Sequence, residues 1–382
     1  MAWFFIIFFT SFALTNLYLL RRVWQGLAAA PKALRILVIV IMFLSAVSYV
    51  AARALLSGVD SGLYTVVLWM GSIWFAFMHY SILFVLLGEL LRLVMRKRIA
   101  DLKKIPLAYE KIKLRFTLLS LVFVLLTVSY GYFNARDIQV REIELEVEAP
   151  GAELDSLRIA FFADSHLTPV NNGSKAGKIA GIINSLKPDL VLAAGDIVDD
   201  QIYRLRSRNI DQPLKKITST YGTFVANGNH EYIVGVEEAD EFLTAAGFNV
   251  LRDSLTTIAG SITIAGREDS AISRFTDGKR KDVKELLSSD SAGLPIIVLD
   301  HQPFALWKTA QAGAAMQLSG HTHHGQIWPF NFVTSMIYEV SWGYKKIENM
   351  HVYVTSGAGT WGPPVRTGSS SEIVLIRLSL KK

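Results

Sequence analysis

The sequence has no cysteine and few charged residues. Without cysteine the chain has no disulfide bonds, thiolate metal ligands or cysteine nucleophile. Any metal bound by side chains would therefore be held by His, Asp, Glu or Asn. Charged residues make up only 19% of the chain and apolar residues 51%. This balance is too apolar for a single soluble globule of 382 residues, and it predicts that part of the chain lies in a membrane.

Most of the apolar excess lies in the first third of the chain, in runs at residues 2–20, 36–52, 63–87 and 116–133. Each run is about as long as a helix needs to cross the hydrocarbon core, roughly 17–25 residues. The first run lacks the positive start and the small-residue cleavage site of a signal peptide. We therefore predict a four-helix transmembrane anchor at residues 1–134.

Basic residues crowd two of the loops between these runs. Four Lys and Arg residues fall in the first loop, at 21–35, and nine fall in the third, at 92–115. By the positive-inside rule both loops are cytoplasmic, which places everything after Asn134 outside. We predict a multi-pass protein of the cytoplasmic (inner) membrane with an extracytoplasmic C-terminal domain. Because the basic residues belong to these loops, nucleic acid is not an expected partner.

Residues 135–156 are predicted to connect the anchor to that domain. The alternation of apolar and polar residues from Ile138 to Val147 indicates a strand with one buried face. From residue 157 to 382 the chain alternates between strand and helix patterns, which is typical of an α/β domain. The predicted strands are 157–163, 190–194, 222–226, 295–299, 315–318, 352–355 and 373–378, and the predicted helices are 174–186 and 237–246.

Asp, Asn or His follows each of the first five strands. Six of the eight histidines lie at these strand ends, namely His166, His230, His301, His321, His323 and His324. Loops at the carboxyl ends of strands converge on one crevice, so we expect these side chains to meet in one site. Mixed imidazole, carboxylate and amide ligands suit Mn, Fe or Zn. Two such ions can clamp the attacking and leaving oxygens of a phosphoryl transfer.

Five ordered motifs resemble those of calcineurin-like metallophosphoesterases: Asp164-x-His166, Gly195-Asp196-x-x-Asp199, Gly228-Asn229-His230, His301 and Gly320-His321-x-His323. Each motif is weak alone, but the ordered set is specific. The resemblance covers residue 157 to the C-terminus. It implies a four-layer αββα metallophosphoesterase sandwich of two mixed sheets flanked by helices, which the strand pattern by itself does not specify.

The resemblance also implies a role for each motif residue. One divalent metal ion would be held by Asp164, His166 and His323. A second would be held by Asn229, His301 and His321. Asp196 would bridge both ions, and a hydroxide between them, formed near neutral pH, would attack phosphorus. The catalytic residue His230 would stabilise developing charge or protonate the leaving oxygen.

Three further residues each have two interpretations. Asp199 would orient a ligand histidine or asparagine, or cap its own loop. Arg366 lies in a glycine-rich stretch, 357–366, that resembles a closing loop of membrane-attached family members; it would contact phosphate in a forked geometry or form a structural salt bridge. His324 would face the substrate or, as we favour, point to solvent.

The segment 327–344 is rich in large apolar side chains: Trp328, Phe330, Phe332, Met336, Ile337, Tyr338, Trp342 and Tyr344. We expect it to pack over the sandwich core, because aromatic clusters are more often core than interface. The alternative is an apolar lip that rests on the bilayer and admits a lipid tail.

These features predict a membrane-bound phosphoesterase that hydrolyses a phosphodiester or pyrophosphate by two-metal activation of a bridging hydroxide. The membrane anchor points to a lipid-linked or other cell-envelope substrate. A phosphomonoesterase is an alternative that the motifs do not separate. A non-catalytic membrane sensor is a second alternative, but all seven implied ligands and His230 are present. The sequence specifies no oligomeric state.

Overall fold

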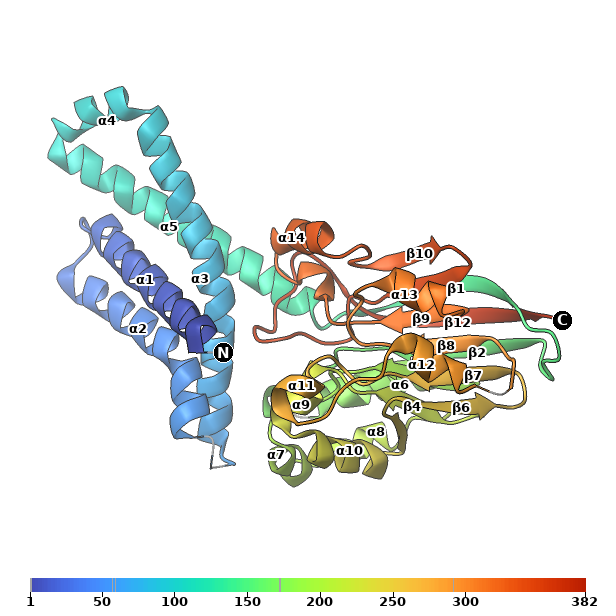
Figure 1. Cartoon of the computed structure of the whole chain (residues 1–382). Coiled ribbons are helices and arrows are strands. Elements are labelled where there is room, and N and C mark those ends of the chain that lie inside the picture. The colour runs from blue at the N-terminus through green and yellow to red at the C-terminus, as the bar shows by residue number, and fades with distance from the viewer. Residues whose placement is uncertain (1, 57, 59, 172, 291) are drawn as a thin grey trace. The chain divides into compact units, whose positions relative to one another are not determined.

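The structure is a computed structural model that describes residues 2–56, 58, 60–171, 173–290 and 292–382. It divides into two units (Figure 1). The first unit comprises Met1–Tyr132 with Gly362–Val365, and the second comprises Phe133–Trp361 with Arg366–Lys382.

The first unit contains the candidate membrane spans. Within the part of the chain that the structure describes, four helices are long and apolar enough to cross a membrane: α1 (Ala2–Gly26), α2 (Lys32–Leu55), α3 (Gly62–Val94) and α5 (Pro106–Asn134). Each predicted apolar run lies within one of them, which confirms the four-helix prediction. The short helix α4 (Arg96–Lys103), in the basic third loop, was not predicted.

Close backbone packing joins α2 and α3. Gly71 lies against the backbone of Tyr49, where a Cβ would be only 2.3 Å from the Tyr49 nitrogen. Small residues let apolar helices approach in this way. Between α1 and α3, the Trp74 indole donates a hydrogen bond to Asn16 Oδ1 at 2.9 Å, so two buried polar groups satisfy each other.

The second unit contains two six-stranded sheets, ordered β1-β12-β2-β3-β4-β5 and β10-β11-β9-β8-β7-β6. The strands of the first sheet are β1 (Ile138–Glu148), β2 (Ser156–Phe162), β3 (Leu190–Ala194), β4 (Thr223–Ala226), β5 (Phe248–Leu251) and β12 (Ser371–Lys381). The strands of the second are β6 (Ser254–Ile258), β7 (Ile262–Gly266), β8 (Ile296–Leu299), β9 (Met316–Ser319), β10 (Gly343–Ile347) and β11 (Met350–Val354). Both sheets are mixed, because each contains parallel and antiparallel pairs.

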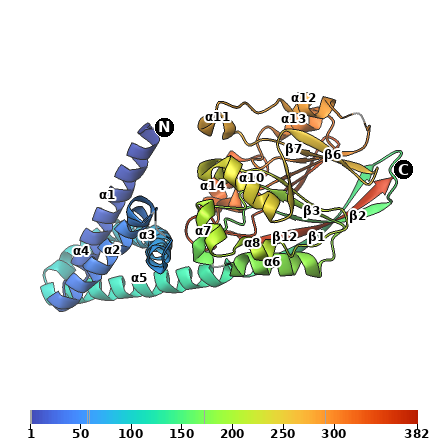
Figure 2. The ribbon, with the colours of Figure 1, turned by 90° about the horizontal axis from the view of Figure 1, so that it is seen from below.

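Three apolar clusters define the layers of this unit. The central cluster joins inward-facing residues of both sheets, such as Phe161 and Ile264. A second lies between the first sheet and the helices α6 (Ser174–Ser185), α7 (Ile202–Ser207), α8 (Asp211–Leu214) and α10 (Val236–Ala245). The third lies under α12 (Val283–Ser288) and α13 (Leu306–Gln311), on the outer face of the second sheet (Figure 2). This order of layers confirms the αββα sandwich.

Short elements complete the unit at the loops that follow the strands. They are α9 (Asn229–Val234), α11 (Ile272–Phe275), α14 (Phe330–Ile337), and the 3-10 turns η1 (Pro169–Asn171) and η2 (His323–Gly325).

Part of the predicted connector belongs to the first sheet. Strand β1 pairs in parallel with β12 along its whole length, from Ile138 opposite Ser371 to Glu148 opposite Lys381. Its apolar residues Ile143, Leu145 and Val147 pack on the central cluster. The alternation in the sequence therefore corresponds to an edge strand of the second unit.

Candidate metal centre

The implied ligands all follow strands in the middle of the two sheets. Asp164 and His166 follow β2, Asp196 follows β3, and Asn229 and His230 begin α9 after β4. From the second sheet, His301 follows β8, and His321 and His323 follow β9. The site is therefore assembled at one edge of the sandwich, from both sheets, as the strand-end pattern predicted.

The backbone that carries the ligands is unusual. Five of the implied ligands have left-handed φ values: 53° at Asp164, 42° at His166, 53° at Asp196, 72° at His321 and 48° at His323. Non-glycine residues rarely adopt this conformation, and each costs free energy. Strain of this kind persists only where the surroundings hold the loop in place.

Glu231 is one such support. Its side chain is fully buried and accepts hydrogen bonds from the backbone nitrogens of Asp196 at 2.9 Å, Ile197 at 2.7 Å, Val198 at 3.1 Å and Gly228 at 2.7 Å. One carboxylate thus joins the loops after β3 and β4. Nothing in the sequence shows that four backbone donors converge on Glu231.

Two glycines make room for the ligand carboxylates. A Cβ on Gly228 would lie 2.2 Å from Asp196 Oδ1, and a Cβ on Gly320 would lie 2.3 Å from Asp164 Oδ2. Both distances are far below any real contact, so the glycines of these motifs are required by close packing.

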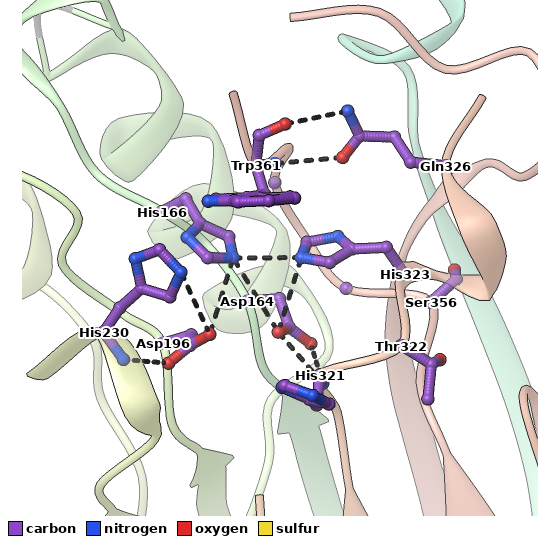
Figure 3. A network of polar contacts seen from close by, with 12 residues as sticks. Asp164, His166, Asp196, His230, His321, Thr322, His323, Gln326, Ser356 and Trp361 are labelled. Carbon is purple, nitrogen blue, oxygen red and sulfur yellow. Dashed lines mark hydrogen bonds and ion pairs between the residues drawn. The ribbon is translucent and has the colours of Figure 1, made fainter. Parts of the chain in front are cut away.

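The first group of potential ligands comprises Asp164, His166 and His323 (Figure 3). His166 Nε2 and His323 Nε2 lie 2.9 Å apart. Asp164 Oδ1 lies 3.8 Å from His166 Nε2 and 3.6 Å from His323 Nε2. Atoms that share one ion at 2.0–2.2 Å are about 3–3.6 Å apart, so this group is close to a coordination geometry.

The second group comprises Asp196, His301 and His321. Asp196 Oδ2 lies 3.1 Å from His301 Nε2, which lies 3.2 Å from His321 Nδ1. The other ring nitrogen of His301 lies 2.7 Å from the carbonyl of Ala194 and donates to it. This bond turns Nε2 toward the site, which is the orientation that a metal ligand requires.

Asp196 connects the two groups. Its Oδ2 is also 3.8 Å from His166 Nε2, while its Oδ1 accepts the backbone N–H of His230 at 2.8 Å. A single carboxylate thus contacts both groups, which is the position of a bridging ligand.

Asn229 supplies the clearest sign that the site is built for a cation. Its side-chain oxygen is buried and has no hydrogen-bond partner. A buried polar atom without a partner is costly in a folded protein. An amide oxygen is a ligand for a hard or borderline divalent ion, so a metal would satisfy it. The residues present therefore fit divalent metal binding.

The pKa shifts of the implied ligands differ in direction: burial raises the pKa of Asp164 to about 7, and, although burial opposes it, Asp196 holds the pKa of His301 above its usual range. Burial lowers the pKa of His166 and of His323, which keeps both imidazoles neutral and able to bind metal. Burial, together with the charge of His301, lowers the pKa of His321 to about 3. Burial opposes ionisation of Asp196, but His301 and His230 outweigh it and hold the pKa of this carboxyl well below its usual range.

His230 and Asp199 form a separate pair beside the ligands. Asp199 Oδ1 lies 2.7 Å from His230 Nδ1, and Oδ2 lies 3.5 Å from His166 Nδ1. Burial opposes the charged form of His230, but Asp199 and Asp196 raise its pKa to about 9. The other nitrogen, Nε2, lies 4.0 Å from Asp196 Oδ2, so this side of the ring faces the centre.

Arg366 is not placed to contact a substrate in this structure. Its side chain is fully buried. The guanidinium donates to the carbonyls of Ser356 at 2.6 Å and Gly359 at 2.5 Å, and lies 3.1 Å from His323 Nδ1. Its donors thus support the loop behind His323, an implied ligand, and the hydrogen bonds go to carbonyls and to Ser369 Oγ, at 2.6 Å, rather than to a phosphate.

His324 contacts the protein on the second-sheet side of the site. Its Nδ1 lies 3.1 Å from Ser341 Oγ, and its ring lies 5.3 Å from that of Trp342. It belongs to none of the metal-binding groups found among the described residues.

Aromatic side chains flank the centre. The Trp361 ring lies 6.2 Å from that of His230, and its backbone is held by both amide atoms of Gln326 (Figure 3). On the other flank, Tyr338 lies 6.2 Å from His321 and 4.9 Å from Phe304. Trp361 and Phe304 are at least half exposed, so the mouth of the site has apolar walls.

The prediction that segment 327–344 packs over the sandwich core is wrong for helix α14, residues 330–337. Helix α14 has no buried residue, whereas Ile327 and Val340, on either side of it, are buried. The segment is attached at both ends, and the helix between them projects its apolar side chains outward.

Comparison with known proteins agrees with this centre. The family model for calcineurin-like phosphoesterases matches residues 157–325. The chain is 31% identical to a transmembrane protein with metallophosphoesterase domain from Danio rerio, over 98% of this chain and 89% of that protein. It is 30% identical to uncharacterized metallophosphoesterases of Aquifex aeolicus and Bacillus subtilis, over 66% of this chain and 96% and 91% of those proteins.

The fold and the site define a metal-dependent hydrolase of phosphoric esters. The chain belongs to the calcineurin-like metallophosphoesterase family, with relatives in bacteria and in eukaryotes, and it is a membrane protein.

Proposed function

We propose that the protein hydrolyses a phosphodiester or pyrophosphate bond in a lipid-linked or other cell-envelope substrate, on the extracytoplasmic side of the cytoplasmic membrane. The observation that carries the catalytic part is the Asp196 carboxylate, whose Oδ2 faces His301 of one ligand group and His166 of the other. The side of the membrane rests on the basic first and third loops.

One ion would be held by Asp164, His166 and His323. The other would be held by Asn229, His301 and His321, and Asp196 would bind both ions. When bound, two divalent ions, with Mn, Fe or Zn the best match to these ligands, lower the pKa of water and neutralise phosphate charge. The protein supplies rigid ligands on strained loops, which keeps the donor atoms in place before substrate arrives.

His230 acts on the substrate rather than on a metal. Asp199 holds its Nδ1, so the ring is oriented with Nε2 toward the centre. From there Nε2–H can donate to a phosphate oxygen or give its proton to the leaving oxygen. The aromatic walls formed by Trp361 and Tyr338 favour a substrate with apolar or ring-shaped groups beside the phosphate.

The test uses the full chain, purified in detergent and stripped of metal with a chelator. We expect turnover of a chromogenic phosphodiester only after Mn is added, and a loss of at least about 10³-fold in the Asp196→Ala variant. The control is Asp155→Ala, which removes an exposed carboxylate at the start of β2, the opposite end of that strand from the ligands.

The same preparations distinguish the alternatives. Faster turnover of a chromogenic monoester than of the diester would replace the diesterase with a phosphomonoesterase. If neither ester is cleaved with Mn, Fe or Zn while the protein still binds metal, the enzyme proposal is wrong and the membrane-sensor alternative is favoured.

A further inference from the structure

Helix α14 and the residues before it expose an apolar surface close to the metal centre. Six large apolar side chains project from this segment, and together we call them the lip: Trp328, Phe330, Phe332, Val333, Met336 and Ile337. Met336 is 79% exposed, and none of the residues of α14 is buried.

The lip does not have the composition of a helix that faces water. No charged residue or histidine occurs from Gly325 to Tyr338, whereas a surface helix normally carries polar or charged residues on its outer face. Soluble surfaces rarely show contiguous exposed apolar patches, and those that exist mark contacts with proteins or membranes. Trp and Phe are also the residues that gather where protein meets the lipid interface.

The first residue of the lip is hydrogen-bonded to the loop of residues 366–369. The same loop accepts hydrogen bonds from the last residue of α5, the fourth candidate span. Asn134, the last residue of α5, donates side-chain hydrogen bonds to the carbonyls of Arg366 and Ser369, both at 3.0 Å. Between these two residues, Thr367 Oγ1 accepts the backbone N–H of Trp328 at 3.0 Å. The chain that leaves a membrane-spanning helix therefore contacts, through one loop, the segment that begins the lip.

The lip is also continuous with the mouth of the centre. It begins two residues after Gln326, whose amide holds the backbone of Trp361 beside His230. It ends next to Tyr338, whose ring lies beside that of His321. The exposed apolar surface thus adjoins Tyr338 directly in the chain and is linked to Trp361 through the hydrogen bonds of Gln326.

We propose that the lip inserts into the surface of the lipid bilayer and that the centre acts on phosphoesters of lipids taken from that surface. The contact with lipid stands by itself, whereas the choice of substrate rests on the proposed function. The hydrogen bonds that link Trp328 to Asn134 through residues 366–369 favour lipid over another protein, because Asn134 ends a candidate membrane span.

The absence of cysteine makes the contact measurable in the full chain. A Met336→Cys variant carries a single thiol, which can be labelled with an environment-sensitive fluorophore and reconstituted in phosphatidylcholine–phosphatidylglycerol vesicles. We expect blue-shifted emission that is quenched when lipids with a spin label near the headgroup are included. The control is Asp155→Cys, at the opposite edge of the sandwich, whose label should stay in water and unquenched.

Two outcomes would overturn the contact with lipid. Water-like emission at Met336→Cys would mean that the lip is solvated in the assembled protein. Blue-shifted emission without quenching by spin-labelled lipid would mean that the lip packs against protein, either helices of the same chain or a second copy.

A substrate comparison tests lipid delivery. The triple variant Phe332→Ser, Met336→Ser and Ile337→Ser should lower the ratio of turnover of a vesicle-anchored phosphodiester probe to that of a soluble one by at least about tenfold. An unchanged ratio would show that the lip plays no part in reaching lipid substrates. If the wild-type protein cleaves neither probe, the catalytic proposal fails, and the fluorescence measurement still decides the contact.

Discussion

The carboxylate of Asp199 lies between two histidines that have different roles. It is within hydrogen-bond distance of His230, beside the substrate position, and 3.5 Å from His166, an implied ligand. Burial opposes its ionisation, but His230 and His166 outweigh burial and lower the pKa of Asp199 below its usual range. We infer that Asp199 is a positioning residue: it acts through the orientation of His230.

This inference predicts a specific kinetic result. The Asp199→Asn variant keeps the size of the side chain but weakens the bond to His230 Nδ1, so kcat should fall about 10–100-fold while KM changes little. Metal content, measured by mass spectrometry of the purified protein, should equal that of wild type. A loss of metal in parallel with kcat would instead show that Asp199 supports His166 and the ion.

The loops after β3 and β4 are the elements on which the centre depends. The left-handed backbone at Asp196 is held by Glu231, which belongs to α9 and reaches across to the β3 loop. Two strands and one short helix are thus joined by a buried carboxyl group that accepts hydrogen bonds from four backbone N–H groups. A carboxylate that accepts several backbone N–H bonds is stabilised by them, and its removal leaves those donors unsatisfied.

Removing this support should unfold the loops before it affects the rest of the sandwich. We expect Glu231→Ala to destabilise the metal-free protein by about 2–4 kcal/mol, measured by thermal unfolding in detergent. Glu231→Gln, which keeps one acceptor oxygen, should cost less. Glu241→Ala, an exposed residue of α10, should stay within about 0.5 kcal/mol of wild type. Equal stability of all three variants would contradict this role.

At the scale of the whole molecule, the loops between the candidate spans predict on which side of the membrane the catalytic unit lies. Four spans with basic first and third loops support the proposal that the second unit lies outside the cytoplasm, where a cell-envelope substrate would be available. Lipid contact through the lip would bring the centre to the membrane that anchors it. Under this proposal the spans, the lip and the metal centre would serve one purpose, hydrolysis at a lipid surface.

Single-cysteine variants can measure on which side of the membrane the second unit lies. In intact spheroplasts a membrane-impermeant maleimide should label Asp155→Cys, in the second unit, but should label Lys97→Cys, in α4 of the third loop, only after permeabilisation. Both residues are exposed, so reactivity reports the side of the membrane. The reverse pattern would place the catalytic unit in the cytoplasm and exclude an extracytoplasmic substrate.

Some elements could not be predicted from local pattern. Strand β6 is partly polar and half-buried, and β10 carries two exposed lysines, Lys345 and Lys346. Both are edge strands, which need only one neighbour and bury less apolar surface, so their periodicity is weak. The sequence pattern likewise did not show that the predicted connector is part of the first sheet, because its pairing with β12 joins residues more than 200 positions apart.

The sequence by itself determined the four apolar spans, the orientation expected from their loops, and the strand-end motifs that define the metal centre. These properties depend on residue type and spacing along the chain. Only the tertiary structure decided that Asp196 faces both ligand groups, that Glu231 joins two loops, that Arg366 lies behind His323, and that α14 is exposed. Each of these depends on which distant segments lie side by side, because burial and hydrogen bonding are set by three-dimensional neighbours rather than by position in the chain.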